Sequence, residues 1–445
     1  MNFEESVRYL LSLGRELAAP TQAAAAKFDL ENILTLAESL GHPERRYLSV
    51  HIAGTNGKGS TAAFLEAILR RAGRRTGLYT SPHLERINER IRVDGQEIPD
   101  QTFARVFTAI EGVIERLLAE GRLRAHPTFF ECVTAEALVC FAEAEVDVAV
   151  FETGLGGRLD ATNLLTPAVS VITPVDFDHE NFLGHSLREI AWEKAGIIKP
   201  GVPLVLAAQR EEARQVVVAR ACELGAPLTE PAKSFAVESE QLVEGRAVAI
   251  VREHSSGRTL RIAPSLPGRF QLENALSAAA AARVLAARGV PVSDSDLEQG
   301  IAGTVWPGRI EKVHARPDVY LDGAHNPSAA RELARFLGEQ FAGRRIFLVF
   351  GALRDKAVDE ISGILFPHAA EVIFTEPDTS RAISSAQLAE ISGHHAARFE
   401  IVPRAADALD RALARAAADD VIFIAGSLYL VGQLRGRMRS SELVR

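Results

Sequence analysis

Apolar and polar positions along the chain follow two alternating periods, which predicts strands and helices in succession. Residues 47–52 alternate and predict a strand. Ala62, Leu65 and Leu69 then recur with helical spacing, so a helix that ends near residues 72–73 is expected. Because this strand–helix unit is repeated downstream, the pattern favours an α/β fold built on a parallel, doubly wound sheet.

The same criteria predict further elements in the N-terminal two thirds of the chain. Strands are expected at residues 76–80, 147–152, 169–173 and 202–206. Helices are expected at 101–124, 130–144 and 274–288, and two more lie within 4–41, linked through the alanine cluster 23–26. Residues 236–264 differ in character, since the strand-like runs 248–251 and 259–262 flank the turn 254–257 and predict a hairpin.

A domain boundary is predicted at residues 300–308, which are rich in glycine and contain Pro307. Beyond it, strand–helix units resume, with strands expected at 319–321, 346–350, 371–374 and 421–424. We therefore expect an N-terminal P-loop-type parallel-sheet domain flanked by helices, residues 1–303. A smaller C-terminal α/β, Rossmann-like domain would cover residues 306–445. A cleft between two such domains is a natural ligand site.

Composition narrows the class of protein. The 445 residues are 47% hydrophobic and 24% charged, which is typical of a globular protein, and the net charge of −8 disfavours non-specific nucleic-acid binding. The three cysteines have no metal-ligand spacing. Residues 1–5 open with acidic rather than basic side chains, and no apolar run reaches the length of a membrane span. We expect a cytoplasmic monomer with no membrane or nucleic-acid partner.

The stretch that joins the first strand to its helix is the strongest candidate for chemistry. It consists of Gly54, Thr55, Asn56, Gly57, Lys58, Gly59, Ser60 and Thr61. A strand-to-helix turn of this composition presents backbone N–H groups and a helix N-terminus to an anion. Lys58 adds a positive charge, and Ser60 or Thr61 can reach a phosphate or Mg²⁺. The stretch predicts a phosphate cradle for ATP; the alternative is a glycine-rich turn without a ligand.

This loop departs from the usual P-loop pattern, in which the hydroxyl residue follows the lysine directly. Here Gly59 lies between Lys58 and Ser60, and Gly54 is too close to Gly57.

Other candidates follow predicted strand ends, where ligands gather in parallel sheets. Glu152 ends a hydrophobic strand and could complete a metal site begun by the phosphate loop; the alternative is an ordinary strand-end acid in solvent. Ser81 and His179 also follow strands, although a turn residue and a surface histidine are the simpler interpretations. The local pattern around Lys194 indicates only a lysine on a helix surface.

Several short motifs occur in one order along nearly the whole chain. They are Gly-Thr-Asn-Gly-Lys-Gly-Ser, Ser-Pro-His, Glu-x-Gly-Leu-Gly-Gly, Asp-x-x-Asn, Asp-His, Glu-Lys-Ala-Gly-Ile, Pro-Gly-Arg and Asp-x-Ala-His-Asn-Pro. In this order the chain resembles the folylpolyglutamate synthase family, which includes dihydrofolate synthases, within the Mur ligase superfamily.

The resemblance implies ATP, two Mg²⁺ ions and a monovalent cation such as K⁺ as cofactors. Ser81 and Glu152 would bind one magnesium ion with the ATP phosphates, and Glu152 and His179 would bind a second. Lys194 would be carbamylated, because a CO₂ adduct turns its cation into an anion that can support the metal site. Lys58, Lys194, Arg309 and His179 are thus the expected catalytic residues.

The resemblance also implies a set of nucleotide contacts. Asn274 would face the adenine, Arg309 would reach the phosphates from the interdomain linker, and Asp322 and His325 would hold the nucleoside from the second domain. The alternatives are a helix N-cap for Asn274, a surface ion pair for Arg309 and a plain turn at Asp322.

The acceptor would be a pteroate or folate. In the family members with both synthase activities, residues that align with Thr128, Phe130, Asp160 and Ala161 would hold the pterin of dihydropteroate. Phe130 would pack on the ring and Asp160 would hydrogen-bond its polar edge; the alternative for Phe130 is a core aromatic.

The function expected from these features is ATP-dependent ligation of L-glutamate to dihydropteroate, tetrahydrofolate or both, through an acyl phosphate. Magnesium, Lys58 and Arg309 would neutralise the transferring phosphoryl group. A peptidoglycan ligase of the Mur type and a P-loop switch or transport ATPase are the alternatives. A dinucleotide-dependent dehydrogenase is disfavoured because no Gly-x-Gly-x-x-Gly follows a strand.

Overall fold

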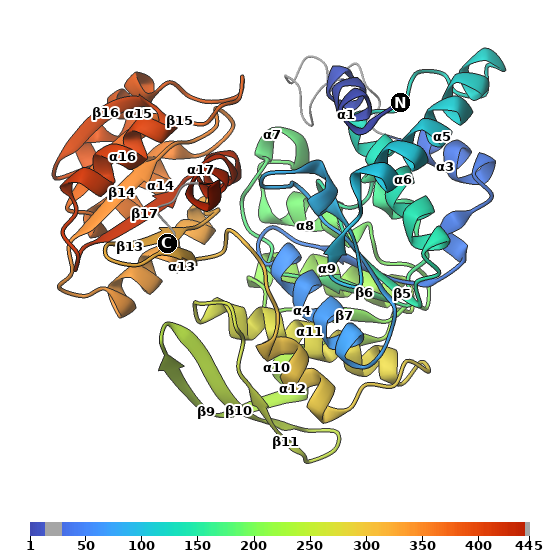
Figure 1. Ribbon diagram of the computed structural model, residues 1–445. Helices are drawn as coiled ribbons and strands as arrows, with labels where there is room; N and C mark the ends of the chain where they lie inside the picture. The colour runs from blue at the N-terminus through green and yellow to red at the C-terminus, as the bar shows by residue number, and fades with distance from the viewer. Residues whose placement is uncertain (14–28, 441–445) are drawn as a thin grey trace.

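Three β-sheets and their covering helices make up the protein in a computed structural model that describes residues 1–13 and 29–440 (Figure 1). The alanine cluster at 23–26, expected to link two helices, lies outside the described residues. The α/β class expected from the sequence is confirmed.

The central sheet has eight strands in the order β4-β3-β2-β5-β1-β6-β7-β8. Six neighbouring strands, β2, β5, β1, β6, β7 and β8, are parallel. The other two, β3 and β4, are antiparallel additions at one edge. The strands are β1 (Leu48–Ala53), β2 (Thr76–Tyr79), β3 (Ile91–Val93), β4 (Gln96–Glu97), β5 (Val148–Glu152), β6 (Val169–Ile172), β7 (Leu204–Leu206) and β8 (Leu228–Thr229).

Helices cover both faces of this sheet because its parallel strands are apolar on both sides. One face packs on α4 (Lys58–Arg71), α11 (Phe270–Ala286) and α12 (Asp294–Ala302). The other face packs on α1 (Phe3–Ser12), α3 (Glu31–Ser39), α5 (Asp100–Ala119) and α6 (Phe129–Glu143). A third core, beside β6 and β7, includes α7 (Glu180–Leu183), α8 (Leu187–Ala195) and α9 (Glu211–Glu223).

One predicted helix is shorter than expected. The apolar pattern extended the helix to residue 124, but α5 ends at Ala119. Gly121 adopts a left-handed conformation (φ 68°) and donates its N–H to Leu118, which closes the helix in the manner of a glycine cap. Leu123 still packs in the core, so it fitted the helical period without being helical.

A small antiparallel sheet, β11-β10-β9, packs against α11 and α12 at the lower side of the view in Figure 1. It is formed by β9 (Phe235–Val243), β10 (Arg246–Glu253) and β11 (Thr259–Ile262), after the short α10 (Pro231–Ser234). The predicted hairpin between β10 and β11 is confirmed. The sequence analysis missed β9, because most of its side chains are exposed and give no apolar alternation.

The C-terminal sheet has six strands in the order β12-β13-β17-β14-β15-β16, all parallel except β12. Its strands are β12 (Glu311–His314), β13 (Asp318–Leu321), β14 (Ile346–Phe350), β15 (Glu371–Glu376), β16 (Phe399–Arg404) and β17 (Val421–Ala425). Its helices are α13 (Pro327–Gln340), α14 (Val358–Leu365), α15 (Ser385–Ser392), α16 (Ala405–Arg415) and α17 (Leu428–Ser440). The four strands predicted for this region are therefore confirmed.

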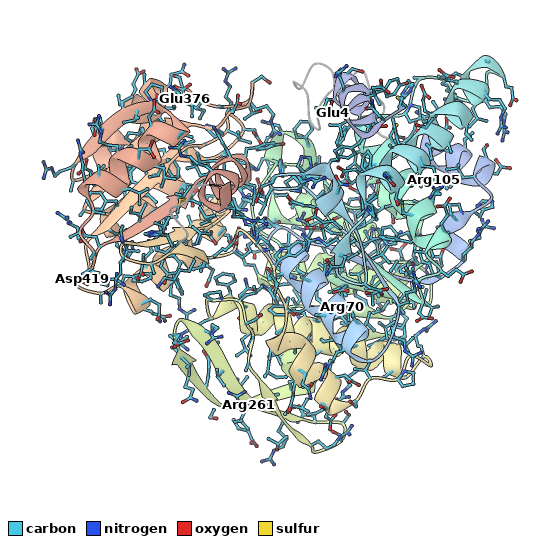
Figure 2. All side chains as sticks on the ribbon, viewed as in Figure 1. Glu4, Arg70, Arg105, Arg261, Glu376 and Asp419 are labelled. Carbon is cyan, nitrogen blue, oxygen red and sulfur yellow. The ribbon has the colours of Figure 1, made fainter. Side chains whose placement is uncertain are left out.

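Charged side chains such as Arg105, Arg261 and Asp419 lie on the periphery of the three sheets (Figure 2). Within the described part of the chain, every helix is too short or too polar to cross a lipid bilayer.

Candidate active site

The phosphate loop connects the end of β1 to the first turn of α4, as the sequence predicted. Gly57 precedes the helix in a left-handed conformation (φ 84°). Gly54, at φ 153°, passes so close to β6 that an added Cβ would lie 1.8 Å from Oγ1 of Thr173. The loop is anchored to the polypeptide after β6, since Thr55 and Asn56 both donate their N–H groups to the carbonyl of Pro174. The backbone of this turn is thus fixed before any ligand binds.

Close packing explains the extra glycine in the loop. A Cβ on Gly59 would lie 3.1 Å from Nε1 of Trp306, a residue of the interdomain linker. A Cβ on Gly57 would lie 2.3 Å from Oδ1 of Asn274 on α11. Asn274 is buried inside that helix and bonds to Gln271 at 2.9 Å, so it is not the N-cap that the sequence left open. Two elements distant in sequence therefore flank the phosphate loop.

Two lysines share one carbonyl of the loop. Lys58 donates to the carbonyl oxygens of Gly54 and Thr55, each at 3.1 Å, and Lys194 donates to the carbonyl of Gly54 at 2.8 Å. Burial, together with the charge of Lys58, lowers the pKa of Lys194 to about 7. Lys194 is 4% exposed, so its interpretation as a helix-surface lysine is wrong. An amine with this pKa has a substantial uncharged fraction near neutral pH, and that fraction is available as a nucleophile.

Glu152 lies at the carboxyl end of β5 and is buried, not solvated. Its Oε2 accepts the backbone N–H of Ser81 at 3.2 Å. Burial raises the pKa of this carboxyl group, while Lys58 and Arg309 oppose the rise. Ser81, Glu152 and Arg309 line one pocket together with Gly59 and Trp306. The structure thus brings residues from distant parts of the sequence together beside the phosphate loop.

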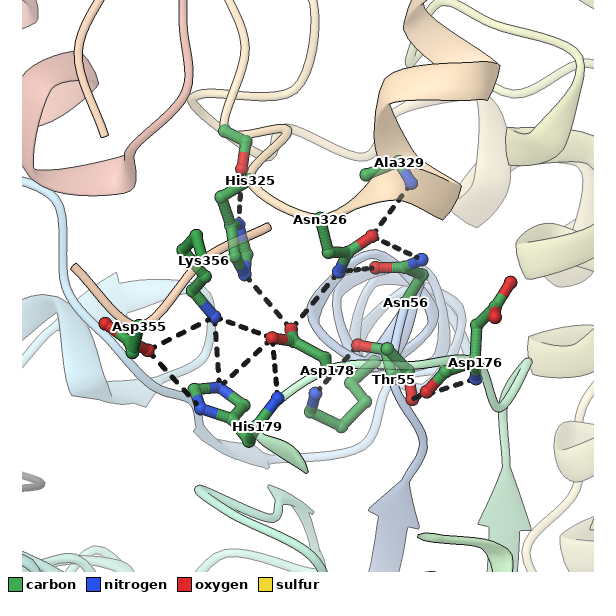
Figure 3. Close-up of polar contacts among 12 residues, drawn as sticks. Thr55, Asn56, Asp176, Asp178, His179, His325, Asn326, Ala329, Asp355 and Lys356 are labelled. Carbon is green, nitrogen blue, oxygen red and sulfur yellow. Dashed lines mark hydrogen bonds and ion pairs between the residues drawn. The ribbon is translucent and has the colours of Figure 1, made fainter. Parts of the chain in front are cut away.

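His179 meets the C-terminal domain in a half-buried polar cluster (Figure 3). Its Nε2 lies 3.4 Å from Nζ of Lys356, which also contacts Oδ1 of Asp178 at 2.7 Å. Burial lowers the pKa of the His179 ring to about 3, so the imidazole is neutral. Its Nδ1 is buried and has no hydrogen-bond partner among the described residues, although Oδ2 of Asp355 is 3.8 Å away. A neutral imidazole of this kind can serve as a metal ligand.

Asp178 joins the two domains across the same cluster (Figure 3). It accepts Nδ2 of Asn326 at 3.2 Å and faces Nε2 of His325 at 3.5 Å. Although burial alone would raise its pKa, the hydrogen bond from His325 and the charge of Lys356 hold that pKa well below its usual range. Asn326 also pairs with Asn56 of the phosphate loop, at 2.9 Å and 3.3 Å. The predicted residue His325 therefore does face the N-terminal domain.

Asp322 has a different environment from the plain turn that the sequence left open. It is buried after β13 and accepts the N–H groups of Ile310 at 2.9 Å and Ala324 at 2.8 Å. Arg309 donates to the carbonyl of Gly308 at 3.0 Å and lies against Gly323. The carboxylate of Asp322 thus fixes the linker that carries Arg309.

The four expected acceptor residues are not equally available. Thr128 is the N-cap of α6 in a reciprocal capping box with Glu131. The ring of Phe130 is half-buried and packs on Gly154, where an added Cβ would lie 2.6 Å from it. Asp160 and Ala161 are buried in the loop that follows β5.

Asp160 already has a full set of internal donors. Its Oδ2 accepts the N–H groups of Gly154 and Leu155 at 2.8 and 2.9 Å, and its Oδ1 accepts the N–H and the hydroxyl of Thr162. A carboxylate offers about four lone-pair positions, so a further bond to a pterin would displace one of these donors.

Comparison with known proteins identifies the family. A model of the Mur ligase middle domain matches residues 52–282, and a model of the Mur ligase glutamate ligase domain matches residues 308–428. The dihydrofolate synthase/folylpolyglutamate synthase of Bacillus subtilis (strain 168) is 37% identical over 407 residues, which cover 91% of this chain and 93% of that protein. The chain belongs to the folylpolyglutamate synthase family.

Solved structures of this family share the whole fold. The Mycobacterium tuberculosis folylpolyglutamate synthase complexed with ADP and AMPPCP superposes with a TM-score of 0.87 at 32% identity, covering 98% of this chain and 99% of that one. The bifunctional folylpolyglutamate synthase/dihydrofolate synthase of Yersinia pestis, complexed with AMPPNP and a manganese ion, gives a TM-score of 0.83 at 32% identity, covering 99% and 98%. As a member of the folylpolyglutamate synthase family, the chain is an ATP-dependent ligase, so the predicted family and enzyme class are confirmed.

The residues present suit a divalent cation of the kind used by a folylpolyglutamate synthase. Glu152 supplies a buried carboxylate that accepts one hydrogen bond within the described residues, from the N–H of Ser81, and Ser81 supplies a hydroxyl beside it. Nδ1 of His179 and Oγ1 of Thr61 are buried polar atoms with no hydrogen-bond partner in the described part of the chain. Hard oxygen ligands and a neutral imidazole match Mg²⁺ or Mn²⁺ better than a soft metal.

Sequence reasoning missed three residues of this site, Asp178, Asn326 and Lys356. Asp178 and Asn326 adjoin His179 and His325, so the two motifs that contained these histidines could have indicated them. Lys356 follows the end of β14 in the turn Arg354-Asp355-Lys356, and strand-end position was a usable signal. Its ion pair with Asp178 spans 178 positions of sequence and could not be read from local pattern.

Proposed function

We propose that the chain ligates L-glutamate to both dihydropteroate and reduced folates, and so carries the two activities named for its Bacillus relative. The observation that supports this most is the convergence of Ser81, Glu152 and Arg309 on one pocket at the domain boundary, which is also lined by Gly59, the neighbour of Lys58 in the phosphate loop. A phosphate cradle, a buried carboxylate and a linker arginine there suit phosphoryl transfer from ATP to an acceptor carboxylate.

The first step moves the γ-phosphoryl group of ATP to the carboxylate of the acceptor. The acceptor oxygen forms a bond to phosphorus as the bond to the β-phosphate oxygen breaks, and ADP leaves. The positive charges of Lys58 and Arg309 stabilise the negative charge that develops on the equatorial oxygens during the transfer. Bound Mg²⁺, held by Ser81, Glu152 and His179, would supply further charge neutralisation of the phosphates.

In the second step the α-amine of glutamate attacks the acyl phosphate. The new C–N bond replaces the C–O bond to phosphate, inorganic phosphate leaves, and the amine loses a proton. The interdomain contacts of Asp178 with Asn326 and Lys356 support a role for the C-terminal domain in closing the site. Exclusion of water at that point protects the acyl phosphate from hydrolysis.

Lys194 is proposed to carry a carbamate. Its buried amine, with a pKa of about 7, has a substantial uncharged fraction near neutral pH, and the uncharged amine can attack CO₂. Attack forms a nitrogen–carbon bond and releases one proton, so the neutral amine becomes an anion beside the phosphate loop. Two Mg²⁺ ions, a monovalent cation such as K⁺, and a cytoplasmic monomer complete the proposal.

The direct test offers purified protein ATP, Mg²⁺ and labelled glutamate, with dihydropteroate and tetrahydrofolate in parallel reactions. We expect label in both acceptors and ADP release only when acceptor and glutamate are both present. Label in tetrahydrofolate alone would remove the dihydrofolate synthase half of the proposal. ADP release at the same rate without either substrate would refute the ligase assignment and favour a P-loop ATPase.

A further inference from the structure

A buried chain of hydrogen bonds connects β1 to the loop that follows β5. Nε2 of His51 lies 2.7 Å from Oγ1 of Thr162, and that hydroxyl in turn bonds to Oδ1 of Asp160. His51 is 0% exposed, Thr162 is 0% exposed and Asp160 is 5% exposed. None of the catalytic steps above uses His51 or Thr162. The role of this buried series of hydrogen bonds therefore has to be sought outside those steps.

The direction of the chain follows from the number of protons available. Each oxygen of Asp160 accepts two donors, which leaves no position for a carboxyl proton and indicates an ionised carboxylate, although burial raises its pKa. The single hydroxyl proton of Thr162 is then donated to Asp160, so the Thr162 oxygen must accept a hydrogen bond from Nε2–H of His51. Nδ1 of His51, which has no hydrogen-bond partner in the described residues, is left as an unprotonated nitrogen. Burial lowers the pKa of the ring to about 3, so the imidazole stays neutral.

The other end of the chain is the backbone just beyond Glu152. Oδ2 of Asp160 accepts the N–H groups of Gly154 and Leu155, two and three residues after the strand-end carboxylate. Gly154 is the residue on which the ring of Phe130 packs. A change in the orientation of the Asp160 carboxylate would therefore move the surface that supports Phe130.

This network is separate from the one that anchors the phosphate loop. Val50 and Ile52 point into the core shared with α4, whereas His51 is registered with Phe151 and faces the side of the sheet covered by α6. The phosphate loop is bonded instead to the segment after β6, through Pro174 and Asp176. Disturbing His51 or Thr162 should therefore reach the Phe130 side of the site before it reaches the nucleotide side.

We propose that His51 and Thr162 are positioning residues for the pteroate or folate acceptor, acting through Asp160 on the backbone of Gly154 and Leu155. The inference rests on the proposed function, and it assigns to His51 and Thr162 the orientation of the Asp160 carboxylate at the acceptor wall. The four donors from its own loop that hold this carboxylate support such a role.

Two matched pairs of variants test the chain. Thr162→Val keeps the shape but removes the hydroxyl, whereas Thr162→Ser retains it. His51→Leu removes the donor, whereas His51→Gln places an amide N–H near the position of Nε2. KM values for dihydropteroate and for ATP are measured for each variant with the full-length protein, alongside Asp160→Asn.

We expect Thr162→Val and His51→Leu to raise the KM for dihydropteroate at least tenfold while the KM for ATP stays within twofold of wild type. Thr162→Ser and His51→Gln should restore the acceptor KM to within threefold. An unchanged acceptor KM in Thr162→Val, with a raised one in Asp160→Asn, would show direct contact by Asp160 and overturn the proposal.

A parallel rise in both KM values, or failure of both Thr162→Val and His51→Leu to fold, would identify a purely structural network and also overturn it. Failure of the proposed function has a different signature, because wild-type protein would then show no acceptor-dependent ADP release. The two failures are therefore distinguished in the same set of assays.

Discussion

Parallel strands in two different sheets each carry a buried carboxylate at the carboxyl end. Glu152 is the last residue of β5, and Asp322 directly follows β13. Both precede a glycine-containing turn, and burial raises the pKa of both. Asp322 accepts two backbone N–H groups, from Ile310 and Ala324, at 2.9 and 2.8 Å. Glu152 accepts one, from Ser81, at 3.2 Å, and it lines the pocket at the phosphate loop.

The comparison separates two uses of the same sequence signal. A strand-end carboxylate whose oxygens are held by backbone donors fixes the conformation of its neighbours, as Asp322 does for the linker. One with fewer protein donors retains lone pairs for a cation, as we propose for Glu152. We therefore propose that the number of backbone donors, not burial or strand position, distinguishes a structural acid from a ligand-binding one in this protein.

The largest effect expected on the Glu152 side comes from removing the charge of the phosphate loop. Lys58→Ala should lower glutamate- and acceptor-dependent ADP release by about 10³-fold, because Lys58 contributes charge to the transferring phosphoryl group. Within the described part of the chain, Lys58 hydrogen-bonds to the carbonyls of Gly54 and Thr55 in its own loop, so the fold should persist by circular dichroism. Lys233→Ala, on an exposed ion pair far along the sequence, is the control. Activity equal to wild type in Lys58→Ala would contradict the cradle assignment.

Glu152→Gln tests whether the carboxylate with fewer backbone donors binds a metal ion. We expect about 10²-fold lower activity and loss of the increase in melting temperature that Mn²⁺ gives in the presence of a non-hydrolysable ATP analogue. Without metal, the variant should be at least as stable as wild type, since burial already disfavours the charged form of Glu152. A retained metal-dependent shift would exclude Glu152 as a ligand.

Asp322→Asn tests whether the carboxylate with two backbone donors stabilises the fold. One carboxylate oxygen becomes an NH₂ group that cannot accept from Ile310 or Ala324, so we expect a loss of about 1–3 kcal/mol in the free energy of unfolding. Denaturant unfolding measures this loss. A variant as stable as wild type but defective in nucleotide binding would place Asp322 among the ligand-binding acids instead.

The smallest effect expected over a single step of one pH unit is the pH dependence contributed by Lys194. Its folded pKa of about 7 lies below the unfolded value of 10.5, so between these pH values the unfolded chain binds a proton that the folded chain does not. Stability should therefore rise with pH in this window, by up to about 1.4 kcal/mol per pH unit relative to Lys194→Met. Unfolding in CO₂-free buffer measures the difference. Parallel stability curves for the two proteins would show that Lys194 is protonated in the fold.

Local pattern was sufficient for most of the architecture. Buried parallel strands such as β5 and β14 are continuous apolar runs, and the phosphate loop has a composition that few other turns share. The exposed strand β9 and the early end of α5 were missed, because the first has no apolar face and the second depends on a glycine cap beyond a still-apolar sequence.

The site was harder to predict because it depends on long-range partners. Lys194 has the sequence environment of a surface lysine, and only the packing of α8 against the phosphate loop buries it. Asp160 was expected to contact a ligand, yet its four donors come from its own loop. Lys356 is identified only by the structure, in which the segment after β14 meets the segment after β6 through the ion pair of Lys356 with Asp178. The spacing of residues within a motif does not indicate how many hydrogen-bond partners a side chain already has in the folded protein.

The contact between Trp306 and the phosphate loop has a practical consequence for spectroscopy. The chain contains two tryptophans, and the second, Trp192, is 48% exposed on α8 and lies beneath the guanidinium of Arg220. Trp306 lies against Gly59 with the guanidinium of Arg92 over its ring. A Trp192→Phe variant would thus carry a single tryptophan, which lies against the phosphate loop, and its selectively excited emission is expected to report nucleotide binding in stopped-flow experiments without any attached dye.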